Sequence, residues 1–163
     1  MQLEGKENAK TMVISDYLKE EFCLVNLESH DKKGAIRELA QKLSTSGSLI
    51  DLEKFINDVI KREELGSTGI GNKVAIPHAR TDAVKGLVVS FGRSQEGIKF
   101  DALDGDKVKL IFLMGADPSQ LSLYLRILAE LSKLLMNNSF RQELISAETP
   151  KEVIKIIKKF ERV

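Results

Sequence analysis

The residues best suited to chemistry lie in one short segment, residues 66–80 of a 163-residue chain. Three glycines and two hydroxyls lead into an apolar run that ends on Pro-His-Ala-Arg. Backbone N–H groups of a glycine-rich loop can bind an anion without a helix dipole. A neutral imidazole is a competent nucleophile near pH 7. The segment therefore predicts a reactive His78 beside a small anion, with Ser67, Thr68 and Gly69 as candidate anion contacts.

The predicted chemistry is transfer of a phosphoryl group. This reaction depends on in-line positioning and charge stabilisation more than on acid–base work. His78 and Arg80 are two residues apart, so on an extended backbone their side chains project to the same side. Arginine suits phosphate because its guanidinium is planar and always charged. Arg62, at the end of a predicted helix, is a second arginine that could fold back over the loop.

Other interpretations of the same residues stay open at this stage. Gly66 and Gly71 have the separation of a P-loop, but Asn-Lys follows where Lys-Ser/Thr is required. A dinucleotide fingerprint needs strand, glycines and then helix, whereas the predicted order here is helix, glycines, strand. The plainest alternative is that His78 is a satisfied histidine at a strand end and the glycines form only a turn.

Periodicity and capping residues predict the elements around this segment. Asp31 caps a helix with apolar positions 36, 39, 40 and 43, and Asp51 caps a second helix that Gly66 ends. Thr149-Pro150-Lys151-Glu152 forms a capping box that opens a last helix. Short apolar runs predict strands at residues 22–27, 74–77, 86–91 and 108–114.

The second half of the chain adds one turn and two helices. Residues 98–103 alternate in polarity and run into Asp104-Gly105, a turn signal. Residues 121–135 leave little polar face, which predicts a central, buried helix, and 140–145 form a short one. Helices flank strands on both sides in sequence, so a single α/β domain is expected, preceded by a disordered N-terminus over residues 1–11.

Composition excludes several classes. The chain has 25 basic and 24 acidic residues, which gives no nucleic-acid footprint. The one cysteine, Cys23, allows no intrachain disulfide and lies in an apolar run typical of a buried residue. No apolar stretch reaches membrane-span length and no signal-peptide core appears, so we expect a cytoplasmic protein without direct membrane insertion.

Residues 62–80 closely resemble the active-site signature of enzyme IIA domains. These domains belong to the bacterial phosphoenolpyruvate-dependent sugar phosphotransferase system, in its fructose/mannitol class, and the nitrogen-regulatory enzyme IIA proteins share the signature. The similarity extends to residues 14–18 and 98–105 and covers roughly residues 12–160. The chain is thus identified as a member of a family whose fold is a mixed β-sheet flanked by helices on both faces, here over residues 12–163.

The resemblance implies a phosphocarrier. His78 would be phosphorylated on Nε2 by the phosphorylated histidine-containing phosphocarrier protein. The acceptor would be a cysteine or histidine of an enzyme IIB that loads an incoming sugar. No metal or organic cofactor is implied. The alternative is a regulatory enzyme IIA whose phosphorylation state controls a protein partner, and a third possibility is an anion-binding or structural domain that transfers nothing. Exposed apolar surface around His78 is expected to bind partners in transient, small contacts.

Two positions depart from the family pattern. Tyr124 occupies the place of a second histidine near the start of the long helix. A phenol can donate one hydrogen bond to a phosphoryl oxygen but brings no positive charge. Lys73 stands where the family often has glycine. The other histidine, His30, matches no functional position and is expected at the surface.

Overall fold

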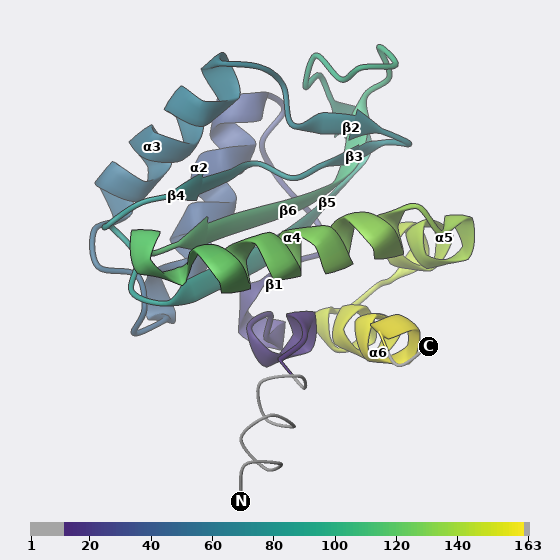
Figure 1. Ribbon diagram of the computed structural model, residues 1–163. Coiled ribbons are helices and arrows are strands. Elements are labelled where there is room, and N and C mark those ends of the chain that lie inside the picture. Colours follow the sequence, from purple (N-terminus) through teal and green to yellow (C-terminus); the bar gives the residue numbers. More distant parts are fainter. Residues whose placement is uncertain (1–11, 162–163) are drawn as a thin grey trace, which may run out of the picture.

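The computed structural model describes residues 12–161, which form one mixed β-sheet covered by helices on both faces (Figure 1). The predicted disorder of residues 1–11 lies outside this range. The α-helices within it are α2 (Lys32–Lys42), α3 (Leu52–Glu64), α4 (Leu121–Leu135), α5 (Asn138–Ser146) and α6 (Pro150–Glu161). The strands are β1 (Cys23–Leu24), β2 (Gly69–Gly71), β3 (Val74–Ala75), β4 (His78–Arg80), β5 (Leu87–Ile98) and β6 (Val108–Ala116).

The sheet has the strand order β1-β5-β6-β3-β2, and β4 also pairs with β6. The central β5–β6 pair and the β2–β3 hairpin are antiparallel, whereas β1–β5, β3–β6 and β4–β6 are parallel. Strands β3 and β4 lie one after the other along the same edge of β6. They are separated at Ile76 and Pro77, where proline lacks the N–H that a continuous ladder would use. The α/β class and the mixed sheet are therefore confirmed.

The expected caps form. Asp31 accepts a hydrogen bond from the Gly34 amide at 2.6 Å, and Asp51 accepts one from the Lys54 amide at 3.1 Å. Each bond satisfies a backbone donor that the first turn of a helix leaves free, which fixes where α2 and α3 begin. Thr149 accepts from the Glu152 amide in the same way before α6, but the Glu152 carboxylate accepts from the Glu148 amide at 2.8 Å, so the predicted capping box forms only in its first half.

Helices α2 and α3 lie on one side of the sheet and α4 on the other (Figure 1). A Cβ at Gly115 would clash with the Phe55 ring of α3, so glycine lets this helix approach β6 closely. Ala79 of β4 pairs with Gly115 and shares its face. The small residues bring α3 next to β4.

Three predictions about elements were wrong. The strand expected over residues 22–27 is only Cys23–Leu24, preceded by a 3-10 turn over Glu20–Phe22. Strand β2 was not expected. Helix α4 is not buried all round: Leu121 and Leu125 are 43% and 52% exposed on its outer side. The leucines of α4 therefore lie both on the face that packs against the sheet and on the face that meets solvent.

Candidate active site

His78 is the first residue of β4 and follows directly after the strand break at Pro77. Its register partner is Met114 of β6, so its side chain lies on the face opposite Ala79 and Gly115. That face carries α4. The backbone thereby turns the imidazole toward the N-terminal half of α4, where the ring is half-buried.

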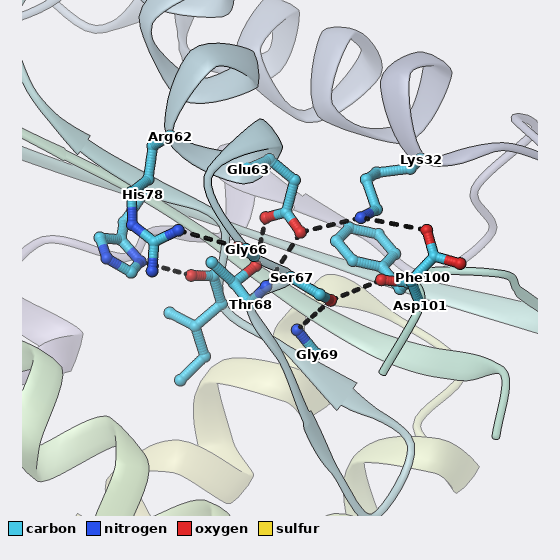
Figure 2. Close-up of polar contacts among 11 residues, drawn as sticks. Lys32, Arg62, Glu63, Gly66, Ser67, Thr68, Gly69, His78, Phe100 and Asp101 are labelled. Atoms are coloured by element: carbon cyan, nitrogen blue, oxygen red, sulfur yellow. Dashed lines mark hydrogen bonds and ion pairs between the residues drawn. The ribbon is translucent and has the colours of Figure 1, made fainter. Parts of the chain in front are cut away.

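One short hydrogen bond assigns the tautomer of His78. Nδ1 lies 2.6 Å from the carbonyl oxygen of Ile76 (Figure 2). A carbonyl can only accept, so Nδ1 carries the proton and Nε2 keeps the free lone pair. Burial lowers the pKa of His78 below its ordinary value, the Ile76 carbonyl raises it less, and the Arg62 charge lowers it. The neutral, nucleophilic form is therefore favoured.

Two arginines stand beside this imidazole. Arg62, in the last turn of α3, donates from Nη1 to the carbonyl oxygen of Gly66 at 2.8 Å (Figure 2). Arg80 is the exposed end of β4 and projects to the same face as His78. Within residues 12–161 neither guanidinium is ion-paired, so both charges are free to meet an anion.

Tyr124 of α4 completes this end of the site. Its ring centroid lies 5.9 Å from that of His78, and the side chain is buried. Burial raises the pKa of Tyr124, while the charges of Arg80 and Arg62 lower it. The phenol is thus a neutral hydrogen-bond donor at physiological pH, close to both arginines. Its hydroxyl bonds to no other group in the part of the chain that the structure covers.

These four side chains line one open cleft of about 900 Å³. The cleft continues along α3 to Lys54, whose ammonium lies 3.0 Å from Asp58 and 3.2 Å from Asp82. The charge at the far end is therefore compensated, whereas the charge of Arg62 and Arg80 beside His78 is not. The cleft can hold a phosphoryl group at that end.

The predicted loop contacts lie elsewhere. Ser67, Thr68 and Gly69 do not line the cleft and bond within the protein instead (Figure 2). Ser67 Oγ donates to the Phe100 carbonyl and accepts from the Gly69 amide. The amide and hydroxyl of Thr68 both donate to Glu63, at 2.9 and 2.6 Å. Their predicted contact with a phosphoryl group stays a prediction, and the bonds favour a role in shaping the loop.

Sequence reasoning missed Glu63. This carboxylate is only 5% exposed. A signal was present, because residues 55, 59 and 63 follow each other at four-residue spacing along the buried stripe of α3. A charged residue on such a stripe needs a partner and is a candidate for a special role.

The remaining predicted features lie apart from the cleft. His30 is at the surface, 3.9 Å from Glu96. Cys23 is buried, and burial raises its pKa to about 12. Lys73 is 3.7 Å from Asp106 and does not line the cleft. No helix within residues 12–161 combines the length and apolar character needed to cross a membrane.

Comparison with known proteins identifies relatives over nearly the whole chain. Residues 16–160 match the family described as "Phosphoenolpyruvate-dependent sugar phosphotransferase system, EIIA 2". The fructose-specific EIIABC component of Bacillus subtilis is 34% identical over 93% of this chain, which spans only 24% of that protein. The fructose-specific EIIA component of Haloferax volcanii is 37% identical, over 80% of this chain and 86% of its own length.

A solved structure has the same fold. The nitrogen regulatory protein IIA-Ntr of Neisseria meningitidis superposes with a TM-score of 0.82 at 31% identity. The match covers 88% of this chain and 98% of that one. Relatives with a sugar-specific name and relatives with a regulatory name therefore share this architecture.

Proposed function

The chain belongs to the EIIA 2 family of the phosphoenolpyruvate-dependent sugar phosphotransferase system, and we propose that Nε2 of His78 accepts a phosphoryl group and passes it to a second protein. Members of this family are phosphotransfer components. The observation that carries the proposal is the hydrogen bond from Nδ1 to Ile76, which leaves Nε2 as the nucleophilic nitrogen of a side chain that lines the cleft.

The proposed step balances without a separate acid or base. The Nε2 lone pair forms an N–P bond while the P–N bond of the donor's phosphohistidine breaks, and that electron pair returns to the donor imidazole. His78 keeps the Nδ1 proton throughout. Arg62 and Arg80 stabilise the negative charge of the group in transit. Transfer to the acceptor reverses the step, with the acceptor nucleophile attacking phosphorus.

In this scheme Tyr124 gives the phosphoryl group a neutral contact, at the position where the family pattern has a histidine that can carry a positive charge. Its hydroxyl donates to a phosphoryl oxygen, and its ring limits the movement of His78 from one side. Ser67, Thr68 and Gly69 act through the loop that they form. The positive charge beside His78 then comes from Arg62 and Arg80, and Lys61 also lines the cleft.

The proposed donor is the phosphorylated histidine-containing phosphocarrier protein, and the proposed acceptor is an enzyme IIB. The Bacillus subtilis relative is named an EIIABC component, and this name puts an A, a B and a C component in one protein. Three leucines are exposed in this region: Leu65 after α3 lines the cleft, and Leu121 and Leu125 belong to α4, the helix that carries Tyr124. They supply apolar surface for docking a protein that must bring its own reactive group to His78.

A regulatory role is the second candidate. The observation that favours it is the likeness to the nitrogen regulatory protein IIA-Ntr. In this case the same phosphorylation of His78 would control binding of a protein partner, and the phosphoryl group would not have to reach a sugar.

The test is phosphorylation in a defined mixture. We expect incubation with phosphoenolpyruvate, enzyme I and the histidine phosphocarrier to add one acid-labile phosphoryl mass. His78→Ala should abolish it, and His30→Ala, which removes the only other histidine, should not. Phosphate on the His78→Ala protein, or none on the wild type beside an active control enzyme IIA, would overturn the proposal. Onward transfer to an enzyme IIB distinguishes the transport role from the regulatory one.

A further inference from the structure

The buried carboxylate of Glu63 holds the glycine-rich loop to α3. Oε1 accepts from the Thr68 hydroxyl at 2.6 Å, and Oε2 accepts from the Thr68 amide at 2.9 Å. The remaining partner comes from another helix: Nζ of Lys32, the first residue of α2, lies 3.0 Å from Oε2. Both oxygens are therefore used, and the buried charge is neutralised by one lysine (Figure 2).

Lys32 also reaches the connection between β5 and β6. Its ammonium lies 4.9 Å from the centre of the Phe100 ring and 3.8 Å from Asp101. The side chain is 20% exposed, so these contacts are partly shielded from water. Lys32 thus links α2, the end of α3 and the β5–β6 connection at one point.

The loop is held from its other side by the same connection. The Ser67 hydroxyl donates to the Phe100 carbonyl, and the Leu103 amide donates to the Gly69 carbonyl at 3.3 Å. A Cβ at Gly69 would lie 2.8 Å from Cβ of Ala102, closer than such atoms approach. The loop over residues 66–69 is therefore held from two sides, by Glu63 and by the connection between β5 and β6.

Arg62 depends on this loop. It precedes Glu63 in α3, and its guanidinium donates to the carbonyl of Gly66, two residues before Thr68. We propose that Lys32 and Glu63 are positioning residues for the His78 site: their ion pair fixes the 66–69 loop, and the loop holds the Arg62 guanidinium at the cleft. The effect that we expect this ion pair to have on the rate of phosphoryl uptake rests on the proposed function. The Glu63 charge also raises the pKa of His78, opposing Arg62.

The chain offers a matched control. Arg37 and Glu53 form a second ion pair between α2 and α3, with Nη1 3.0 Å from Oε2, but both side chains are exposed and neither lines the cleft. Removing this pair changes the attachment of the two helices without touching the loop. The test variants are Glu63→Gln and Lys32→Met, their double variant, and Lys32→Arg. The controls are Glu53→Gln and Arg37→Met.

The probe is phosphoramidate, which needs no protein partner: its P–N bond breaks, ammonia leaves, and Nε2 forms the new bond to phosphorus. We expect uptake per folded molecule to fall about tenfold to a hundredfold in Glu63→Gln and Lys32→Met, the size of effect that a small misplacement of a positioning group produces. The double variant should lose no more than either single one, because the two residues act as a unit. Lys32→Arg should recover much of the rate, and the controls should match wild type.

A second measurement separates this inference from the proposed function. The His78 pKa followed by NMR should fall in Glu63→Gln, and the Thr68 amide should exchange faster in both single variants than in the controls. If wild type takes up no phosphoryl group, the proposed function fails while these two observables still decide the role of the pair. The inference would be overturned if a folded Glu63→Gln protein had the same phosphoryl uptake, His78 pKa and Thr68 amide exchange as the wild type. Equal losses in the Arg37 and Glu53 controls would also overturn it.

Discussion

The rings of His78 and Tyr124 lie with their centroids 5.9 Å apart and their planes inclined by 57°. One ring comes from β4 and the other from α4, on the face of the sheet opposite α3. The fold thus places the phenol beside His78, at the position where the sequence comparison with the family predicted a second histidine. Burial raises the pKa of Tyr124, so under the proposed function it would contact a phosphoryl group without adding charge.

We predict that Tyr124→His still accepts a phosphoryl group and does so faster. The imidazole can donate a hydrogen bond and, when protonated, adds a positive charge near the transferred group. Tyr124→Phe keeps the ring and removes only the hydroxyl, so a decrease of several-fold is expected. Rapid-quench phosphorylation assays on the three proteins measure this. Complete loss of transfer in Tyr124→His would mean that the phenol has a role the imidazole cannot fill.

The pH profile should follow the lowered pKa of His78. The neutral ring is the nucleophile, so uptake should stay constant from neutral pH to below the ordinary value of 6.5 and fall only at lower pH. The stability of the fold should also decrease as the pH falls, because the pKa of His78 is lower in the folded chain than in the unfolded one. The unfolded chain takes up the proton first, so the contribution of His78 is complete above the unfolded pKa and is lost as pH falls toward the folded one. A titration midpoint above 6.5, read by NMR with His30→Ala to remove the other imidazole, would contradict this.

Arg62→Ala should affect both chemistry and titration. Because the Arg62 charge lowers the pKa of His78, its removal should raise that pKa. Uptake should fall at least about tenfold, since a donor aimed at developing charge is lost. Lys61→Ala removes a positive charge from the same helical turn and serves as the comparison. Equal losses in the two variants would indicate a general charge effect in place of a directed contact.

Lys73→Gly should stabilise the fold. Lys73 has φ of 66° in the turn between β2 and β3, a left-handed conformation that costs a lysine about 1 kcal/mol. Glycine removes that cost, although it also gains freedom in the unfolded chain, so a net gain of about 0.5 kcal/mol is expected. Asn72→Gly at φ of 55° should gain less, because asparagine tolerates this region. Urea unfolding compares the two, and a destabilised Lys73→Gly protein would show that its contact with Asp106 matters more.

Local signals predicted much of this fold. Asp31 and Asp51 cap α2 and α3 as expected, because capping is decided within four residues of sequence. Strand β2 was missed because Gly69–Gly71 has almost no strand propensity, and it forms by pairing with β3. The exposure of Leu121 and Leu125 could not be read from composition, since leucine content does not tell which side of a helix meets the sheet.

The candidate site, like the fold, could be predicted only in part from the sequence. His78, Arg62, Arg80 and Tyr124 could be proposed from the motif and the family pattern, and the fold brings them to one cleft. The pairing of Lys32 with Glu63 could not be proposed, because 31 residues separate them and only the packing of α2 beside α3 joins them. Local sequence suggests which groups react, whereas tertiary packing decides what holds them in place.

The burial of Cys23 makes the native chain a convenient host for a spectroscopic label. Its thiol is enclosed, its pKa is raised to about 12, and it is the only cysteine in the sequence. A maleimide reacts with exposed thiolates, so a cysteine introduced at Leu65 would be modified selectively. A fluorophore there would report on a protein arriving at the cleft, and no natural residue would first have to be removed.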